Sequence, residues 1–116
     1  MKDDTHSFLP LNPATLHILV SLAGEDRHGY GIMREVQRQS EDRYKLGPGT
    51  LYDNLQKLMN QKLVEQAPSP IADDDPRRRY YRLSKLGRRV LTAEIERLEQ
   101  VVREAKVHLQ TNPRRA

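Results

Sequence analysis

Residues 47–64 read GPGTLYDNLQKLMNQKLV, and this stretch predicts a helix with one apolar face and one polar face. Pro48 suits the first helical position, because its ring fixes φ and its missing N–H would have no partner there anyway. Leu51, Leu55 and Leu58 recur at the spacing that lines up one side of a helix. The opposite side carries hydrogen-bonding side chains, namely Thr50, Asp53, Gln56, Lys57 and Asn60. Such a face can contact base edges in the major groove of DNA, although an ordinary solvated helix face gives the same pattern.

Two shorter helices are predicted before this stretch. Asn12 and Pro13 suit the N-cap and the first position of a helix that ends at Gly24. Apolar residues cover most of its circumference, which indicates that it packs between several partners. A loop over residues 25–29 leads to a second helix over roughly residues 30–40. Together with the helix that starts at Pro48, these elements predict a helix-turn-helix.

A β-hairpin is predicted after the third helix. Residues 64–67 and 77–83 favour strands, whereas the prolines and aspartates between them favour a loop. Tyr80 and Tyr81 are adjacent and point to opposite faces of a strand, so we expect one of them in the core. The predicted fold is therefore mostly α with a small β-hairpin wing, a winged helix-turn-helix.

One long helix is predicted from Ser84 to about residue 110, where Asn112 and Pro113 stop it. Its apolar residues recur at steps of four and three, the pattern of a coiled-coil seam: Leu91, Ile95, Leu98, Val102, Ala105 and Leu109. We expect this seam to pair with a second subunit; packing back on its own domain is the alternative. The predicted organisation is a DNA-binding domain over residues 11–83, a dimerisation helix over residues 84–110, and flexible tails at 1–10 and 111–116.

Composition narrows the function classes. The length of 116 residues fits one domain. The chain has 20 Lys plus Arg and 16 Asp plus Glu, a net charge of +4. This charge is compatible with a polyanionic partner but does not prove one. The absence of cysteine excludes disulfides and thiolate sites. The four histidines lack metal-site spacing and no catalytic motif is present, so we expect no metal, no cofactor and no enzymatic activity. A polar N-terminus and the lack of a long apolar run predict a cytoplasmic protein outside the membrane.

Three segments of the chain resemble the PadR family of bacterial transcriptional regulators. They read HGYGI at residues 28–32, GTLYDNLQKL at 49–58 with KLV at 62–64, and RRYYRLSKLG at 78–87. They occur in the family's order, and the resemblance covers roughly residues 11–100. The short C-terminal part resembles the branch of the family that dimerises through a single long helix.

The resemblance implies a homodimer that binds double-stranded DNA at a pseudo-palindromic operator, usually as a repressor. It also implies that the third helix enters the major groove through its motif at residues 49–52, and that the wing touches the phosphate backbone. The residues and the resemblance together give these candidate DNA contacts: Lys45, Thr50, Tyr52, Asp53, Gln56, Lys57, Arg77, Arg78, Arg79 and Tyr80.

Two features depart from that expectation. Asp73, Asp74 and Asp75 would repel phosphates, so we expect the wing tip to point away from DNA or to remain mobile. The chain has no tryptophan, so it cannot stack a planar drug between indoles.

Two further hypotheses remain open on the sequence. The first is a winged-helix adaptor that uses the long helix to bind a different protein. The second is a ligand sensor with a small-molecule effector between the long helix and the first helix, which would add to DNA binding and not replace it.

Overall fold

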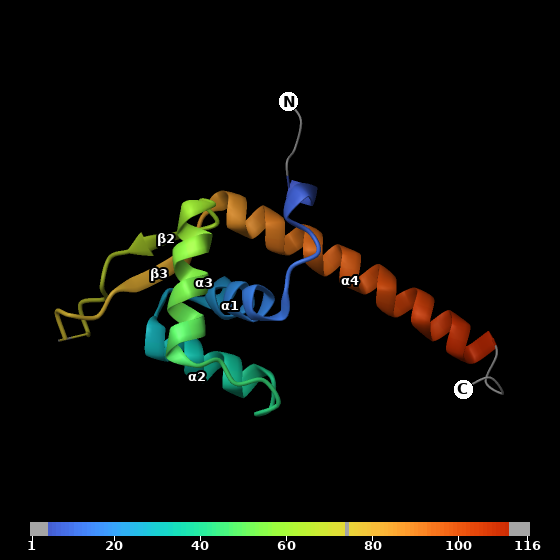
Figure 1. Cartoon of the computed structure of the whole chain (residues 1–116), viewed down its shortest axis with the longest axis horizontal. Coiled ribbons are helices and arrows are strands. Elements are labelled where there is room, and N and C mark those ends of the chain that lie inside the picture. The colour runs from blue at the N-terminus through green and yellow to red at the C-terminus, as the bar shows by residue number, and fades with distance from the viewer. Residues whose placement is uncertain (1–4, 74, 112–116) are drawn as a thin grey trace.

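A computed structural model describes residues 5–73 and 75–111 of the chain (Figure 1). In chain order its elements are η1 (Thr5–Phe8), α1 (Pro13–Gly24), β1 (Arg27–His28), α2 (Gly29–Gln39), α3 (Pro48–Asn60), β2 (Val64–Ala67), β3 (Tyr80–Leu83) and α4 (Lys85–Thr111). This mostly helical fold with a small antiparallel sheet confirms the predicted winged helix-turn-helix with a long C-terminal helix.

The sheet has three strands in the order β1-β3-β2, with Val64 opposite Leu83 and Arg27 opposite Tyr81. The sequence predicted a loop where β1 lies, because a strand of two residues is too short to show an alternating pattern. The predicted strand over residues 77–83 is also too long. It begins only at Tyr80, since the backbone N–H groups of Arg77 and Arg78 donate hydrogen bonds back to Asp75 and not to β2.

The helices begin where side chains or proline satisfy their first turns. Asn12 caps α1 by accepting a hydrogen bond from the Thr15 N–H at 2.9 Å, as predicted. Pro48 opens α3, also as predicted. The cap of α2 is His28, whose Nδ1 accepts from the Gly31 N–H at 3.0 Å, so that helix begins slightly earlier than expected.

Helix α1 lies at the centre of the domain and packs against α2, α3, α4 and β3. Its Ile18 and Leu19 are fully buried, which confirms the prediction that this helix packs between several partners. Tyr80 and Tyr81 are both buried, and Tyr81 belongs to the hydrophobic core cluster, in agreement with the prediction of one tyrosine in the core.

A tight junction holds the start of α4 against the turn after α3. The Ser84 hydroxyl accepts from the Gly87 N–H at 2.9 Å and donates to the Lys62 carbonyl at 2.6 Å. The Gly87 Cα lies directly against the backbone of Leu63, whose carbonyl also accepts from the Ser84 N–H at 3.0 Å. The direction of α4 relative to the domain is therefore set by backbone contacts.

Helix α4 packs on the domain through its first turns and then projects away from it (Figure 1). Leu91, predicted as part of the dimerisation seam, belongs instead to the domain core, because it packs among the buried side chains beneath α4. Residues 101–110 are all exposed. The predicted stop at Asn112 and Pro113 lies outside the described residues, as does residue range 112–116 of the predicted tail.

Glu94 joins the N-terminal segment to α4. Although it is a charged residue on a largely exposed helix, it is buried. One carboxylate oxygen accepts from the Leu11 N–H at 2.9 Å and the other from Arg97 Nε at 2.6 Å. The hydrogen bond from Arg97 holds the pKa of Glu94 below its ordinary value despite the burial. Residues 5–8 were predicted to belong to a flexible tail. They form η1, which packs against α4, and Thr5 is buried. Residues 1–4 of the predicted tail lie outside the described residues.

Candidate nucleic-acid interface

Helix α3 divides into a buried and an exposed face, as the sequence predicted. Its leucines at 51, 55 and 58 are buried in the core. The predicted contact residues Thr50, Asp53, Gln56 and Lys57 are all exposed. Neither Asp53 nor Lys57 forms an ion pair with any residue in the described ranges, so both charges are available to a ligand.

Tyr52 links α3 to the beginning of α2. Its side chain is 49% exposed, and its hydroxyl packs directly against the Cα of Gly29. A Cβ at Gly29 would lie only 2.8 Å from Tyr52 Cζ, so glycine is required there for the tyrosine to keep this position. Residues from two different helices thus fix the side chain at the edge of the α3 face.

We expect Gly29→Ala to weaken DNA binding by about fivefold or more, because the added methyl group pushes the Tyr52 ring into the space next to α3. Stability should change little, since the ring is the free end of a side chain and can move. The matched control is Gly31→Ala in the same helix, where the nearest atom to a new Cβ lies 3.5 Å away. Equal DNA affinity in both variants, measured by fluorescence anisotropy, would contradict the role assigned to Tyr52.

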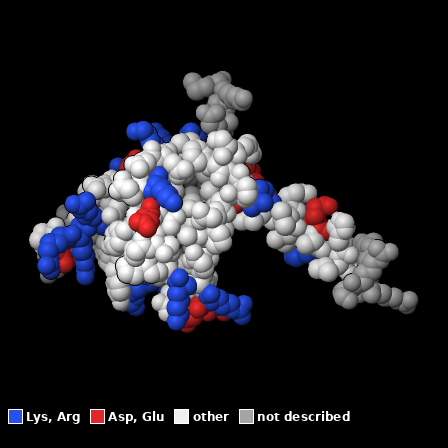
Figure 2. Space-filling model, in the orientation of Figure 1, with Lys and Arg blue, Asp and Glu red and all other residues white. Residues whose placement is uncertain are grey.

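The wing brings three arginines close to Tyr52. Figure 2 shows Lys and Arg side chains gathered over the wing, at the left of the view, with acidic side chains among them. A hollow of about 330 Å³ lies between the wing, the start of α2 and α3. It is lined by His28, Gly29, Tyr30, Tyr52, Asp75, Arg77, Arg78, Arg79 and Tyr81. Lys45 lies apart from this group, near the start of α3, where it lines a separate hollow with Arg34.

Two acidic residues of the wing, Asp73 and Asp75, lie against its arginines. The orientation of the wing tip relative to DNA stays a prediction. Arg78 Nη1 lies 3.5 Å from Asp73 Oδ1, and Arg77 Nε lies 3.4 Å from Asp75 Oδ1. Asp74 lies outside the described residues. Arg79 is exposed and has no ion pair within residues 5–73 and 75–111, so it is the wing arginine best placed to contact a phosphate.

Tyr80 was predicted as a DNA contact, but the structure places its side chain in the interior of the wing and not on the surface. Its side chain is buried, and its hydroxyl donates a hydrogen bond to Asp73 Oδ2 at 2.5 Å. This bond lowers the pKa of Asp73 and raises that of Tyr80. The sequence could not reveal this, because the strand pattern gives no indication of a partner in the preceding loop.

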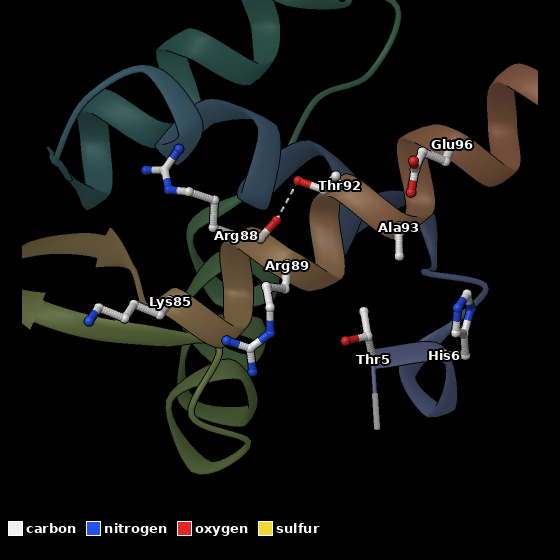
Figure 3. A pocket seen from close by; sticks show the side chains of 8 residues that line it. All are labelled: Thr5, His6, Lys85, Arg88, Arg89, Thr92, Ala93 and Glu96. Atoms are coloured by element: carbon white, nitrogen blue, oxygen red, sulfur yellow. Dashed lines mark hydrogen bonds between the residues drawn. The ribbon is translucent and has the colours of Figure 1, made fainter. Parts of the chain in front are cut away.

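A second hollow, of about 430 Å³, lies between η1 and α4 (Figure 3). Its lining residues are Thr5, His6, Lys85, Arg88, Arg89, Thr92, Ala93 and Glu96. The sequence placed a possible effector between α4 and α1, whereas this hollow is bounded by η1. Figure 3 shows the three basic side chains extending in different directions, so they do not converge on one ligand position.

Two structural absences apply to the described ranges, 5–73 and 75–111. They contain no group of three His, Asp or Glu residues that could hold a metal ion. No helix in them combines the length and apolar character needed to cross a membrane.

The sequence model described as "Transcriptional regulator PadR-like family" matches residues 18–93, which include α2, α3, the wing and the start of α4. The chain belongs to this family. Its members are transcriptional regulators, so the PadR-like chain is a regulator and not an enzyme.

Individual relatives agree with this assignment. Transcriptional regulator Rv3488 of Mycobacterium tuberculosis is 35% identical over 89 residues, which cover 77% of this chain and 78% of the relative. A PadR family transcription regulator from Clostridium difficile superposes with a TM-score of 0.63 at 25% identity, over 86% of this chain and 97% of that structure. Bacillus subtilis PadR in complex with operator DNA shares the fold, with a TM-score of 0.62 at 19% identity, over 74% of this chain and 48% of that one.

Proposed function

We propose that this PadR-like regulator is a cytoplasmic homodimer that binds a pseudo-palindromic operator and represses transcription. The observation that carries the proposal is the exposed, hydrogen-bonding face of α3. Lys57 on this helix and Arg79 on the nearby wing have no ion-pair partner among residues 5–73 and 75–111. Lys57 is suited to a guanine or a phosphate, and Arg79 to a phosphate. A protein of the same fold, Bacillus subtilis PadR, has been solved with operator DNA.

The free part of α4 supports dimerisation. Ile95, Val102 and Leu109 are 39%, 49% and 61% exposed, although they are apolar and share one side of the helix. Together with Leu98 they form a stripe that a second copy of α4 can cover. A twofold dimer can place its two α3 helices about 34 Å apart, in successive major grooves on one side of the duplex. Leu91 is not part of this stripe.

The proposal is tested by capturing genomic DNA fragments with the purified protein and sequencing them. The expected result is enrichment of one inverted-repeat sequence. Anisotropy titrations on the enriched duplex should show affinity that falls steeply with salt, because Lys and Arg side chains displace counterions from the phosphates. Capture of unrelated fragments only, with affinity that is insensitive to salt, would contradict the proposal.

Single substitutions in the interface should weaken operator binding without changing the fold. We expect Lys57→Ala and Arg79→Ala each to reduce operator affinity about tenfold, because each removes one exposed cation from the contact surface. Arg78→Ala should have a smaller effect, since Asp73 and Asp75 already occupy its guanidinium. Lys106→Ala on α4 removes the same charge away from α3 and serves as the control. Unchanged affinity in both the Lys57 and the Arg79 variants would show that this surface does not bind the operator.

The oligomeric state separates this proposal from the adaptor hypothesis. Light scattering of the purified chain should give the mass of a homodimer. A monomer that forms a stable complex only with a different protein would favour the adaptor.

A further inference from the structure

We propose that Asp73 and Asp75 act as intramolecular counter-charges, which compete with DNA phosphates for Arg77 and Arg78 and so lower the affinity of the wing for DNA of arbitrary sequence. This inference rests on the proposed DNA-binding function. It assigns the two aspartates a role in specificity, because they reduce the non-specific binding that the basic wing would otherwise give.

Asp73 is held in place by the body of the wing. Its side chain is only 5% exposed, and its carboxylate accepts hydrogen bonds from the Tyr80 hydroxyl and from the Asp75 N–H at 3.0 Å. Tyr80 is itself buried at the start of β3. The negative charge that faces Arg78 is therefore part of the folded hairpin and not a mobile side chain at its tip.

Asp75 completes the neutralisation. Its Oδ1 accepts from the Arg77 N–H at 2.9 Å and lies 3.4 Å from Arg77 Nε, while its Oδ2 lies 3.9 Å from Arg78 Nε. Arg77 and Arg78 therefore each face at least one carboxylate. Arg79 faces none among the described residues.

These ion pairs reduce the binding free energy that Arg77 and Arg78 gain from contact with a phosphate. A free arginine that contacts a phosphate releases a counterion from the DNA, and this release drives binding to any sequence. An arginine already beside a carboxylate exchanges one anion for another, so it gains little. Base contacts of α3 are unaffected by this exchange, because they depend on hydrogen-bond geometry in the groove. The wing thus adds less to non-specific binding than three arginines would suggest.

The test is the double variant Asp73→Asn with Asp75→Asn, titrated by anisotropy against a duplex of scrambled sequence over a range of NaCl concentrations. Asparagine keeps one oxygen at each position, which can accept the backbone bonds from the N–H groups of residues 75 and 77. At position 73 its NH2 group replaces the second carboxylate oxygen and can donate to the Tyr80 hydroxyl, so the hairpin should persist while both charges are removed. We expect affinity for the scrambled duplex to rise about tenfold at low salt, and the salt slope to steepen by about two, one for each arginine freed.

Two controls separate this inference from simpler causes. Glu96→Gln with Glu104→Gln makes the same change in net charge on α4, far along the chain from the wing, and should leave the affinity nearly unchanged. Tyr80→Phe removes the hydroxyl that holds Asp73 but keeps both negative charges on the wing, so it should give a much smaller rise than the double aspartate variant. An equal rise in either control, or no rise in the double aspartate variant, would overturn the inference.

The outcomes also separate this inference from the proposed function. If the wild-type protein binds its captured operator but the aspartate variant gains no affinity for scrambled DNA, only the inference fails. If neither the wild-type protein nor the variant binds any duplex at low ionic strength, both fail.

Discussion

A variant carrying Leu98→Glu and Val102→Glu should be a monomer, and its operator affinity should fall by about 100-fold or more. The two middle positions of the α4 stripe would then carry charges that repel the same charges on a second copy. Without dimerisation each chain holds the duplex through one α3 helix, and the second contact is no longer intramolecular. Light scattering gives the mass, and anisotropy on the captured operator gives the affinity.

The fold of this variant should be intact, because both positions lie beyond the part of α4 that packs on the domain core. Gln100→Glu with Gln110→Glu adds the same two charges to α4 at exposed positions outside the stripe, and should remain a dimer with normal operator affinity. A dimeric mass for the Leu98 and Val102 variant, or full operator affinity in its monomer, would show that α4 does not join the subunits.

The second large effect is expected for Gly87→Ala, which should lower the free energy of unfolding by about 3 kcal/mol. A Cβ at this position would lie well inside the contact distance of the Leu63 carbonyl oxygen and only 3.0 Å from the Leu63 carbonyl carbon. That carbonyl cannot simply move away, since it accepts the Ser84 N–H at the junction. The melting temperature should therefore fall by about 10 °C or more at fixed protein concentration.

Gly24→Ala provides the comparison, because a Cβ at Gly24 would have no atom within 4 Å. This variant should melt close to the wild-type temperature. If the Gly87 variant melts there as well, the backbone contact between α4 and Leu63 does not limit stability.

The elements that the sequence predicted best are those fixed by local chemistry. The Asn12 cap and the first-turn Pro48 mark helix starts within a few residues, and the leucine spacing of α3 identifies its buried face. Strand β2 has the predicted bounds as well. In each case the deciding interactions lie within one turn or one short segment, so a short sequence pattern is enough to predict them.

The features that the sequence missed depend on partners distant along the chain. Strand β1 exists only because it pairs with β3, and two residues leave no periodic signal. Glu94 looks like one more exposed charge on α4 until the Leu11 N–H and Arg97 meet it. Leu91 fits the seam spacing, yet the angle at which α4 leaves the domain places it in the core.

The candidate interface shows the same division. The exposed face of α3 follows from helical periodicity, and its predicted contact residues are accessible. Composition does not show which of the three wing arginines form ion pairs, because a run of arginines in the sequence does not identify their partners. The return of Asp73 and Asp75 onto Arg77 and Arg78 arises from a turn geometry that single-residue preferences do not specify.

The DNA-binding function proposed for this chain requires that two chains, joined through α4, present two α3 helices to one duplex. Native mass spectrometry of the wild-type protein with its captured operator gives the number of chains bound to each duplex. We expect a complex of two chains and one duplex. A complex of one chain per duplex, or none at low ionic strength, would contradict it.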